Sequence, residues 1–170
     1  MDCSIIKLQR ILKMRITSTQ PMVSTEEQNK QIVSQFFEAL NRQDTERMVQ
    51  LVSTTNFTLY FPGMSPMDWN GSMQFIAVIN NAFPDASRNI EDIVAEGDKV
   101  AVRLNVTGTH KGEFQGIPPT GKKVSFTAMA FLTIIDGKVS KEWSTADIMG
   151  LMQQIGAIPA PPTGSNTAHS

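Results

Sequence analysis

Cysteine and histidine are scarce in this chain, and their scarcity narrows the chemistry it can perform. The 170 residues include one cysteine, Cys3, and two histidines, His110 and His169. A single cysteine excludes an internal disulfide framework and a zinc site built from several cysteines. Two histidines, one of them in a polar tail, leave little for a histidine-based metal centre. We expect acid–base chemistry by a His and an Asp, which needs no metal ion and no cofactor.

Excess charge and long apolar runs are also missing. The formal net charge is −1 at pH 7, which removes the electrostatic case for nucleic acid as the main partner. No run approaches the roughly 20 apolar residues of a membrane span. With 41% hydrophobic residues in 170, the chain has enough apolar material for one globular domain. We expect a cytoplasmic protein.

The two ends of the chain differ from its middle. Residues 1–22 interleave apolar and basic side chains, which makes them too charged for a secretory signal. A transit peptide or a membrane-surface helix would fit, but the segment lacks a clean polar face, so we favour a flexible basic extension. Residues 160–170 are rich in Pro, Ser, Thr and Gly, which predicts a disordered tail. The folded domain is expected over residues 23–159.

The first half of this domain has helical periodicity. Ser24 and Glu27 form a capping-box pattern before a helix that extends to about Leu40. Asp44 is placed to cap a second, short helix. Residues 57–61 are short and β-prone, and residues 72–83 predict a third helix, which Pro84 ends.

From residue 87 the apolar period changes to two. Strands are predicted over residues 90–94, 99–110, 123–135 and 138–147, with Asp136-Gly137 as a hairpin turn. The alternation in 99–110 places His110 in line with the buried face. In 138–147 it places Trp143, Thr145 and Asp147 on one face, which we expect to point inward. Helices followed by an antiparallel meander predict an α+β fold, a curved sheet with helices on its concave side.

Residues 116–123 (GIPPTGKK) nearly spell a phosphate-binding loop. Pro118 and Pro119 lack the amide hydrogens that such a loop uses, and Lys123 stands where a Ser or Thr would hold the metal. The following residues have the period of a strand and not of a helix. We therefore predict a rigid turn over the mouth of a pocket.

Three segments of the chain carry a family resemblance. They are residues 108–122 (GTHKGEFQGIPPTGK), 136–138 (DGK) and 143–156 (WSTADIMGLMQQIG). With this ordered set, the region from about Glu26 to Pro159 resembles the SnoaL-like polyketide cyclase (ester cyclase) group of the nuclear-transport-factor-2-like superfamily. The resemblance implies a cone-shaped α+β barrel with an interior pocket, assembled as a homodimer or higher homo-oligomer. It does not fix the chemistry, since relatives include isomerases, dehydratases, hydrolases and non-catalytic binders.

Asp147 is the first candidate for catalysis. The resemblance implies that this aspartate removes a proton next to a carbonyl, so that the enolate closes a ring by intramolecular aldol addition. Apolar neighbours would desolvate the carboxylate and raise its pKa toward that of a useful base. The alternative is a helix N-cap, because Asp147 directly precedes the helix-like residues 148–155.

Further candidates are His110 as a catalytic helper, and Trp143, Thr133, Phe131 and Met129 as substrate-binding residues. His110 would bind the substrate carbonyl or orient Asp147, or else would only bond a neighbouring loop. Trp143, Phe131 and Met129 could equally serve as core packing. Several family cyclases carry a His or Arg near the position of Thr133, and Thr133 supplies no positive charge to an enolate.

Two kinds of function fit these residues. The first is a cofactor-independent cyclase, isomerase or lyase that acts on a carbonyl-containing, largely apolar small molecule. The second is a non-catalytic small-molecule-binding protein with the same pocket, in which Asp147 only caps a helix.

Overall fold

The computed structural model describes residues 23–159, which form four helices and a five-stranded mixed sheet. The helices are α2 (Thr25–Arg42), α3 (Thr45–Leu51), α4 (Trp69–Ala82) and α5 (Ile148–Ile155). The strands are β1 (Thr58–Tyr60), β2 (Ser87–Glu96), β3 (Lys99–Thr109), β4 (Lys123–Ile135) and β5 (Lys138–Ala146). The predicted basic extension and disordered tail lie outside the described residues.

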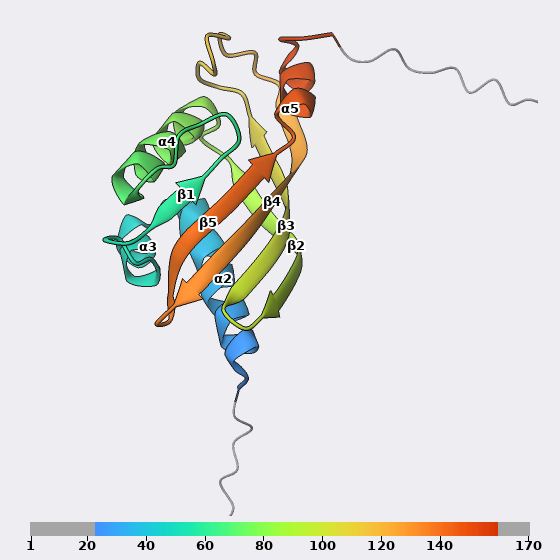
Figure 1. Cartoon of the computed structure of the whole chain (residues 1–170). Helices are drawn as coiled ribbons and strands as arrows, with labels where there is room; N and C mark the ends of the chain where they lie inside the picture. Colours follow the sequence, from blue (N-terminus) through green and yellow to red (C-terminus); the bar gives the residue numbers. More distant parts are fainter. Residues whose placement is uncertain (1–22, 160–170) are drawn as a thin grey trace, which may run out of the picture.

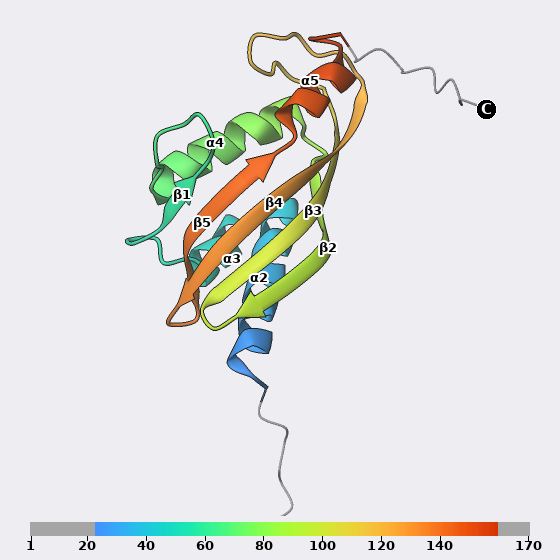
Figure 2. The ribbon, with the colours of Figure 1, turned by 45° about the vertical axis from the view of Figure 1, so that its right-hand side comes forward.

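The sheet has the strand order β1-β5-β4-β3-β2. The meander from β2 to β5 is antiparallel, and β1 joins β5 in parallel. Figures 1 and 2 show a twisted, curled sheet with α2 crossing behind its strands and α4 lying beyond β1. The predicted α+β class is confirmed, but the sheet is curled and not closed into a barrel, so β1 and β2 are its two edge strands.

Local sequence signals account for most boundaries. The side chain of Ser24 accepts a hydrogen bond from the amide of Glu27 at the start of α2, and Asp44 caps α3. Asp136 and Gly137 have φ angles of 50° and 71°, as a tight hairpin turn between β4 and β5 requires. The prediction for α4 began too late: Asp68 accepts a hydrogen bond from the amide of Gly71, so the helix starts at Trp69.

The helices cover one face of the sheet, which we call the inner face. Its buried side chains come from alternate positions of the strands: Val100, Val102, Leu104, Ala130 and Leu132. They form one core with Val33, Phe36 and Phe37 of α2. The opposite, outer face carries exposed apolar side chains that include Met129, Phe131 and Trp143. β4 is the central strand, as its continuous apolar sequence predicts.

Candidate functional site

A cavity of about 530 Å³ lies between the inner face of the sheet and the helices. Most of its wall is apolar, with many aromatic side chains: Phe36, Phe37, Phe57, Phe61, Trp69, Phe75, Phe83, Phe114 and Phe126. A largely apolar cavity with a few polar groups is the usual form of a small-molecule site. The polar groups in its wall therefore decide what chemistry the cavity supports.

Glu142 of β5 and Arg88 of β2 are the charged residues of this wall, and Ser144 of β5 also lines it. Glu142 is 8% exposed, and its carboxylate accepts a hydrogen bond of 2.5 Å from the hydroxyl of Ser144. Nη1 of Arg88 is buried and has no hydrogen-bond partner among the described residues. A buried donor without a partner is costly, and a ligand oxygen in the cavity would satisfy it.

Burial shifts the pKa of both charged groups. Loss of hydration raises the pKa of Glu142, and the hydrogen bond from Ser144 and the charge of Arg88 offset part of that rise. Loss of hydration likewise lowers the pKa of Arg88, against the opposing charge of Glu142. A carboxyl group whose pKa lies above its ordinary value is better suited to exchange protons near neutral pH.

Asn41 fixes the backbone that carries Arg88. Its side-chain amide donates to the carbonyl of Arg88 at 3.1 Å, and its carbonyl oxygen accepts from the amide of Arg88 at 2.8 Å. Because β2 is an edge strand, these two bonds replace those that a neighbouring strand would make. The C-terminal end of α2 thereby sets where the guanidinium enters the cavity.

Asp147 lies at the junction of β5 and α5, where its side chain is exposed. Oδ1 accepts a hydrogen bond of 2.8 Å from the amide of Gly150, so Asp147 is the N-cap of α5. The expectation of an inward, desolvated carboxylate is wrong, and the alternative of a helix cap is confirmed. The catalytic role of Asp147 stays a prediction, without burial to support it.

Trp143, Phe131 and Met129 are on the outer face, 55%, 47% and 52% exposed. None of them lines the main cavity, so their expected inward orientation is wrong. The ring of Trp143 instead stacks on Tyr60, with ring centroids 3.8 Å apart and planes 6° from parallel.

A β-bulge explains why the side chains of β5 lie on the faces opposite to those that the sequence predicts. Near the hairpin, Ile134 pairs with Val139, but beyond the bulge Thr133 pairs with Lys141. This one-residue shift turns every later side chain of β5 to the other face. Glu142 and Ser144 therefore point inward, while Trp143 points outward.

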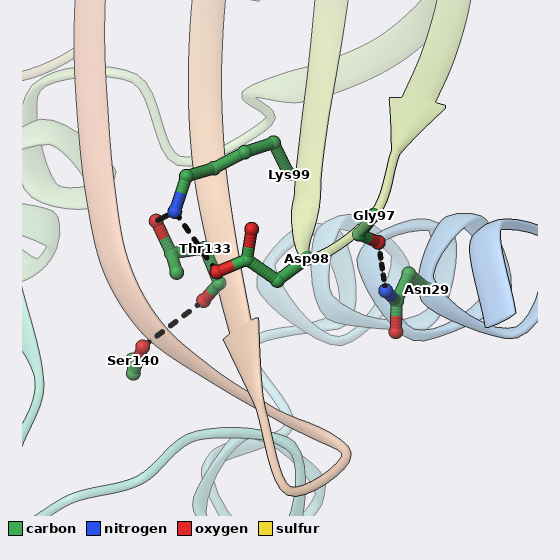
Figure 3. Close-up of polar contacts among 6 residues, drawn as sticks. All are labelled: Asn29, Gly97, Asp98, Lys99, Thr133 and Ser140. Atoms are coloured by element: carbon green, nitrogen blue, oxygen red, sulfur yellow. Dashed lines mark hydrogen bonds and ion pairs between the residues drawn. The ribbon is translucent and has the colours of Figure 1, made fainter.

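Thr133 is buried beside the bulge and outside the cavity lining. Its hydroxyl accepts a hydrogen bond of 3.1 Å from Nζ of Lys99, and its carbonyl accepts one of 3.2 Å from Ser140 (Figure 3). Figure 3 also shows Asn29 of α2 donating to the carbonyl of Gly97, which ties this end of the sheet to α2. Thr133 therefore makes its contacts within the sheet and does not line the cavity.

His110 is fully buried but does not line the cavity. Nδ1 lies 3.1 Å from the hydroxyl of Thr120, and the imidazole stacks on Phe83 with centroids 5.3 Å apart. Phe83 does line the cavity, so His110 supports the wall from behind. The contact with Thr120 matches the alternative in which His110 bonds a neighbouring loop. Its role as a catalytic helper stays a prediction.

The segment directly before the turn that resembles a phosphate loop lies against the cavity, because Phe114 and Gln115 line it, while none of residues 116–123 does. Gln115 is exposed with a φ of 50°, which places it at the opening. β4 follows the turn directly, as the strand period predicts.

Arg88, Glu142 and Ser144 were not among the residues that the sequence singled out. The hairpin turn alone would have paired Thr133 with Ser140 and turned Glu142 outward. The sequence does not reveal the bulge, because no local pattern marks it.

No helix within residues 23–159 has the length and apolar character to cross a membrane. The expected homo-oligomeric assembly stays a prediction.

Comparisons with known proteins agree with this architecture. AclR of Streptomyces galilaeus, a proposed hydroxylase, superposes with a TM-score of 0.75 at 29% identity over 82% of this chain and 87% of that one. A proposed SnoaL-like polyketide cyclase from Jannaschia sp. CCS1 gives a TM-score of 0.73 at 27% identity over 82% of this chain and 99% of that one. Both likenesses cover nearly the whole described part of the chain.

Curated relatives match over a shorter stretch. The aklanonic acid methyl ester cyclase AcmA of Streptomyces galilaeus is 32% identical over 83 residues, which are 48% of this chain and 57% of that protein. The nogalonic acid methyl ester cyclase of Streptomyces nogalater is 29% identical over 84 residues, which are 49% of this chain and 63% of that protein. The match thus spans less than two thirds of each relative. The sequence profile of the SnoaL-like polyketide cyclases matches residues 30–155. The chain therefore belongs to the SnoaL-like polyketide cyclase family.

Proposed function

We propose that this protein is a cofactor-independent cyclase or isomerase that acts on a carbonyl-containing, largely apolar small molecule bound in the cavity. The observation that carries the proposal is that Glu142 and Arg88 both lie in the mostly apolar wall of one cavity. Two relatives are named as methyl ester cyclases, which supports an ester among the substrate's carbonyl groups. In this proposal Glu142 takes the acid–base role that the sequence suggested for Asp147.

The first step is removal of a proton next to a carbonyl. The carboxylate of Glu142 takes the proton from the α-carbon, and the electron pair moves to the carbonyl oxygen to form an enolate. Nη1 of Arg88, which has no partner in the described residues, would donate a hydrogen bond to that oxygen. A preorganised donor in a site that excludes water stabilises such a developing charge strongly.

The second step uses the same two groups. In an intramolecular aldol closure, the enolate carbon attacks a second carbonyl of the substrate and forms a carbon–carbon bond. The protonated carboxyl of Glu142 then gives its proton to the new alkoxide, so one proton is moved and none is lost. The hydroxyl of Ser144 holds the carboxyl in place through both steps by its 2.5 Å hydrogen bond.

Proton removal alone tests the proposal without knowledge of the natural substrate. The probe is a β-keto methyl ester that carries a phenyl group, and the measurement is exchange of its α-hydrogens for deuterium by proton NMR. We expect the wild type to exceed the buffer rate, and Glu142→Gln to lose about 100- to 10,000-fold of that excess. Affinity for the ester should survive, since Gln keeps the shape of the side chain.

Asp147→Asn is the matched comparison, because it also replaces a carboxylate by an amide. The proposal expects exchange to continue in Asp147→Asn. Loss of exchange in Asp147→Asn together with retention in Glu142→Gln would restore Asp147 as the acid–base group. A protein that binds the ester but accelerates no exchange would be a binding protein of this fold, which is the alternative function.

A further inference from the structure

The cavity has a side opening where β1 ends. β1 pairs with β5 only as far as Tyr60, which is opposite Trp143. β5 continues to Ala146, so its last residues have no strand beside them on this edge in the described part of the chain. The backbone turns away through Pro62 and Gly63, whose φ is 78°. The edge of β5 is thus uncovered next to the cavity.

A groove of about 410 Å³ occupies this opening. Five of its residues also line the main cavity: Phe61, Pro62, Met64, Ser144 and Thr145. Only Tyr60 and Trp143 belong to the groove alone. The groove is therefore an outward continuation of the cavity and not a separate site.

Tyr60 and Trp143 give the groove a flat aromatic wall. Their rings are stacked 3.8 Å apart and nearly parallel, and Trp143 is 55% exposed. A large exposed indole that is held by a second ring is preorganised to stack on another planar π-system. Such a wall favours planar, unsaturated ligand groups over flexible aliphatic ones.

Ser144 connects the groove to the charged pair. It lines both spaces, and its hydroxyl bonds Glu142 two residues earlier on the same strand. Residues two apart on a strand are separated by about 7 Å. A carbonyl held at Glu142 therefore lies about 7 Å from Ser144, which borders the groove.

We infer that the groove of Tyr60 and Trp143 is a second binding subsite, which holds a planar, unsaturated extension of the ligand whose carbonyl lies at Arg88 and Glu142. The inference rests on the proposed function for the place of the carbonyl.

The two tryptophans of the chain report on the two spaces separately. Trp69 lines the cavity and Trp143 the groove, and the sequence contains only these two. The probes are the phenyl β-keto methyl ester and an analogue with a three-ring anthracenyl group. The phenyl ester should quench Trp69 fluorescence in Trp143→Phe but leave Trp143 unquenched in Trp69→Phe. The anthracenyl ester should quench both.

Affinity gives the decisive comparison. Trp143→Ala should raise the Kd of the anthracenyl ester about tenfold and leave the Kd of the phenyl ester unchanged. Ile135→Ala, which removes a comparably exposed apolar side chain (50%) at the far end of β4, should change neither. Equal Kd values for the anthracenyl ester in wild type and Trp143→Ala would overturn the subsite.

The outcomes separate this inference from the proposed function. Binding of both esters with no deuterium exchange would overturn the enzyme but keep the subsite. Failure of both esters to bind the wild type would overturn the ligand class and the subsite together. If light scattering shows that Trp143→Ala dissociates an oligomer while the affinity for the anthracenyl ester stays the same, a second copy covers Trp143 and the subsite is wrong.

Discussion

The charges of Arg88 and Glu142 act on each other across the inner face of the sheet, although β3 and β4 separate their strands. The curl of the sheet brings the two side chains to the wall of one cavity. They form no direct ion pair among the described residues. Each charge is therefore buried with incomplete compensation, which is a cost that a stability measurement can detect.

Replacement of Glu142 by Gln should stabilise the protein at neutral pH. The folded-state pKa of Glu142 is raised above its ordinary value of 4.5, so the folded protein favours the protonated form. The stability of the wild type is then fully present below pH 4.5 and falls as the pH rises through the folded-state pKa. Gln mimics the protonated form and avoids this loss, which is about 1.4 kcal/mol for each pH unit that separates the folded-state pKa from the ordinary one.

Urea unfolding between about pH 4 and pH 8 measures this difference in the free energy of unfolding. The advantage of Glu142→Gln should grow with pH and vanish at the acidic end. Glu113→Gln, which changes an exposed carboxylate, is the control and should show no comparable growth. A Glu142→Gln advantage that is independent of pH would mean that Glu142 is not desolvated in solution.

Removal of the guanidinium should move the pH dependence of proton exchange. In Arg88→Met the charge that lowers the pKa of Glu142 is lost, so this pKa should rise further. The α-deuterium exchange profile of the phenyl β-keto ester should then shift to higher pH. Arg88→Lys keeps a cation and should restore most of the profile, but its affinity should stay lower because an ammonium lacks the fork of donors. An unchanged pH profile of exchange in Arg88→Met would mean that the charge of Arg88 does not act on the acid–base group.

Asn41→Ala should destabilise the protein through the edge of β2. The amide and carbonyl of Arg88 would both lose their partner, and each unsatisfied group in a partly buried position costs about 1–3 kcal/mol. Denaturant unfolding measures the loss. Asn89→Ala, at an exposed position on the same strand, is the matched control. If both variants lose the same small amount, Asn41 does not hold the strand.

Asp147→Ala should weaken α5 by about 1 kcal/mol, because the amide of Gly150 loses its capping acceptor. Asp147→Ser should recover most of this stability, since a serine hydroxyl also caps a helix. Thermal unfolding of the three proteins measures the series. A serine variant as unstable as the alanine variant would argue against the capping bond.

The sequence was a good guide wherever the structure follows from local chemistry. β4 and α5 occupy the predicted residues, and the hairpin at Asp136-Gly137 is where the turn signal places it. These elements are fixed by periodicity and turn residues within a short window. The family resemblance rests on the same regions and is confirmed.

The candidate site was less predictable because it depends on register. The bulge between Thr133 and Ile134 moves Glu142 to the inner face. In the sequence Val139 and Trp143 share one alternation, so a regular strand would turn both of them inward. The partnership with Arg88 is also non-local, since it needs the curl of the whole sheet. Neither fact leaves a signal in a short window of sequence.

A crystal structure of the Glu142→Gln variant with the phenyl β-keto methyl ester bound tests the roles of Glu142 and Arg88. The ester should lie in the cavity, with a carbonyl oxygen at hydrogen-bond distance from Nη1 of Arg88 and the α-carbon facing the side chain at position 142. An ester bound outside the cavity, or one whose carbonyl contacts Asp147 in place of Arg88, would contradict these roles.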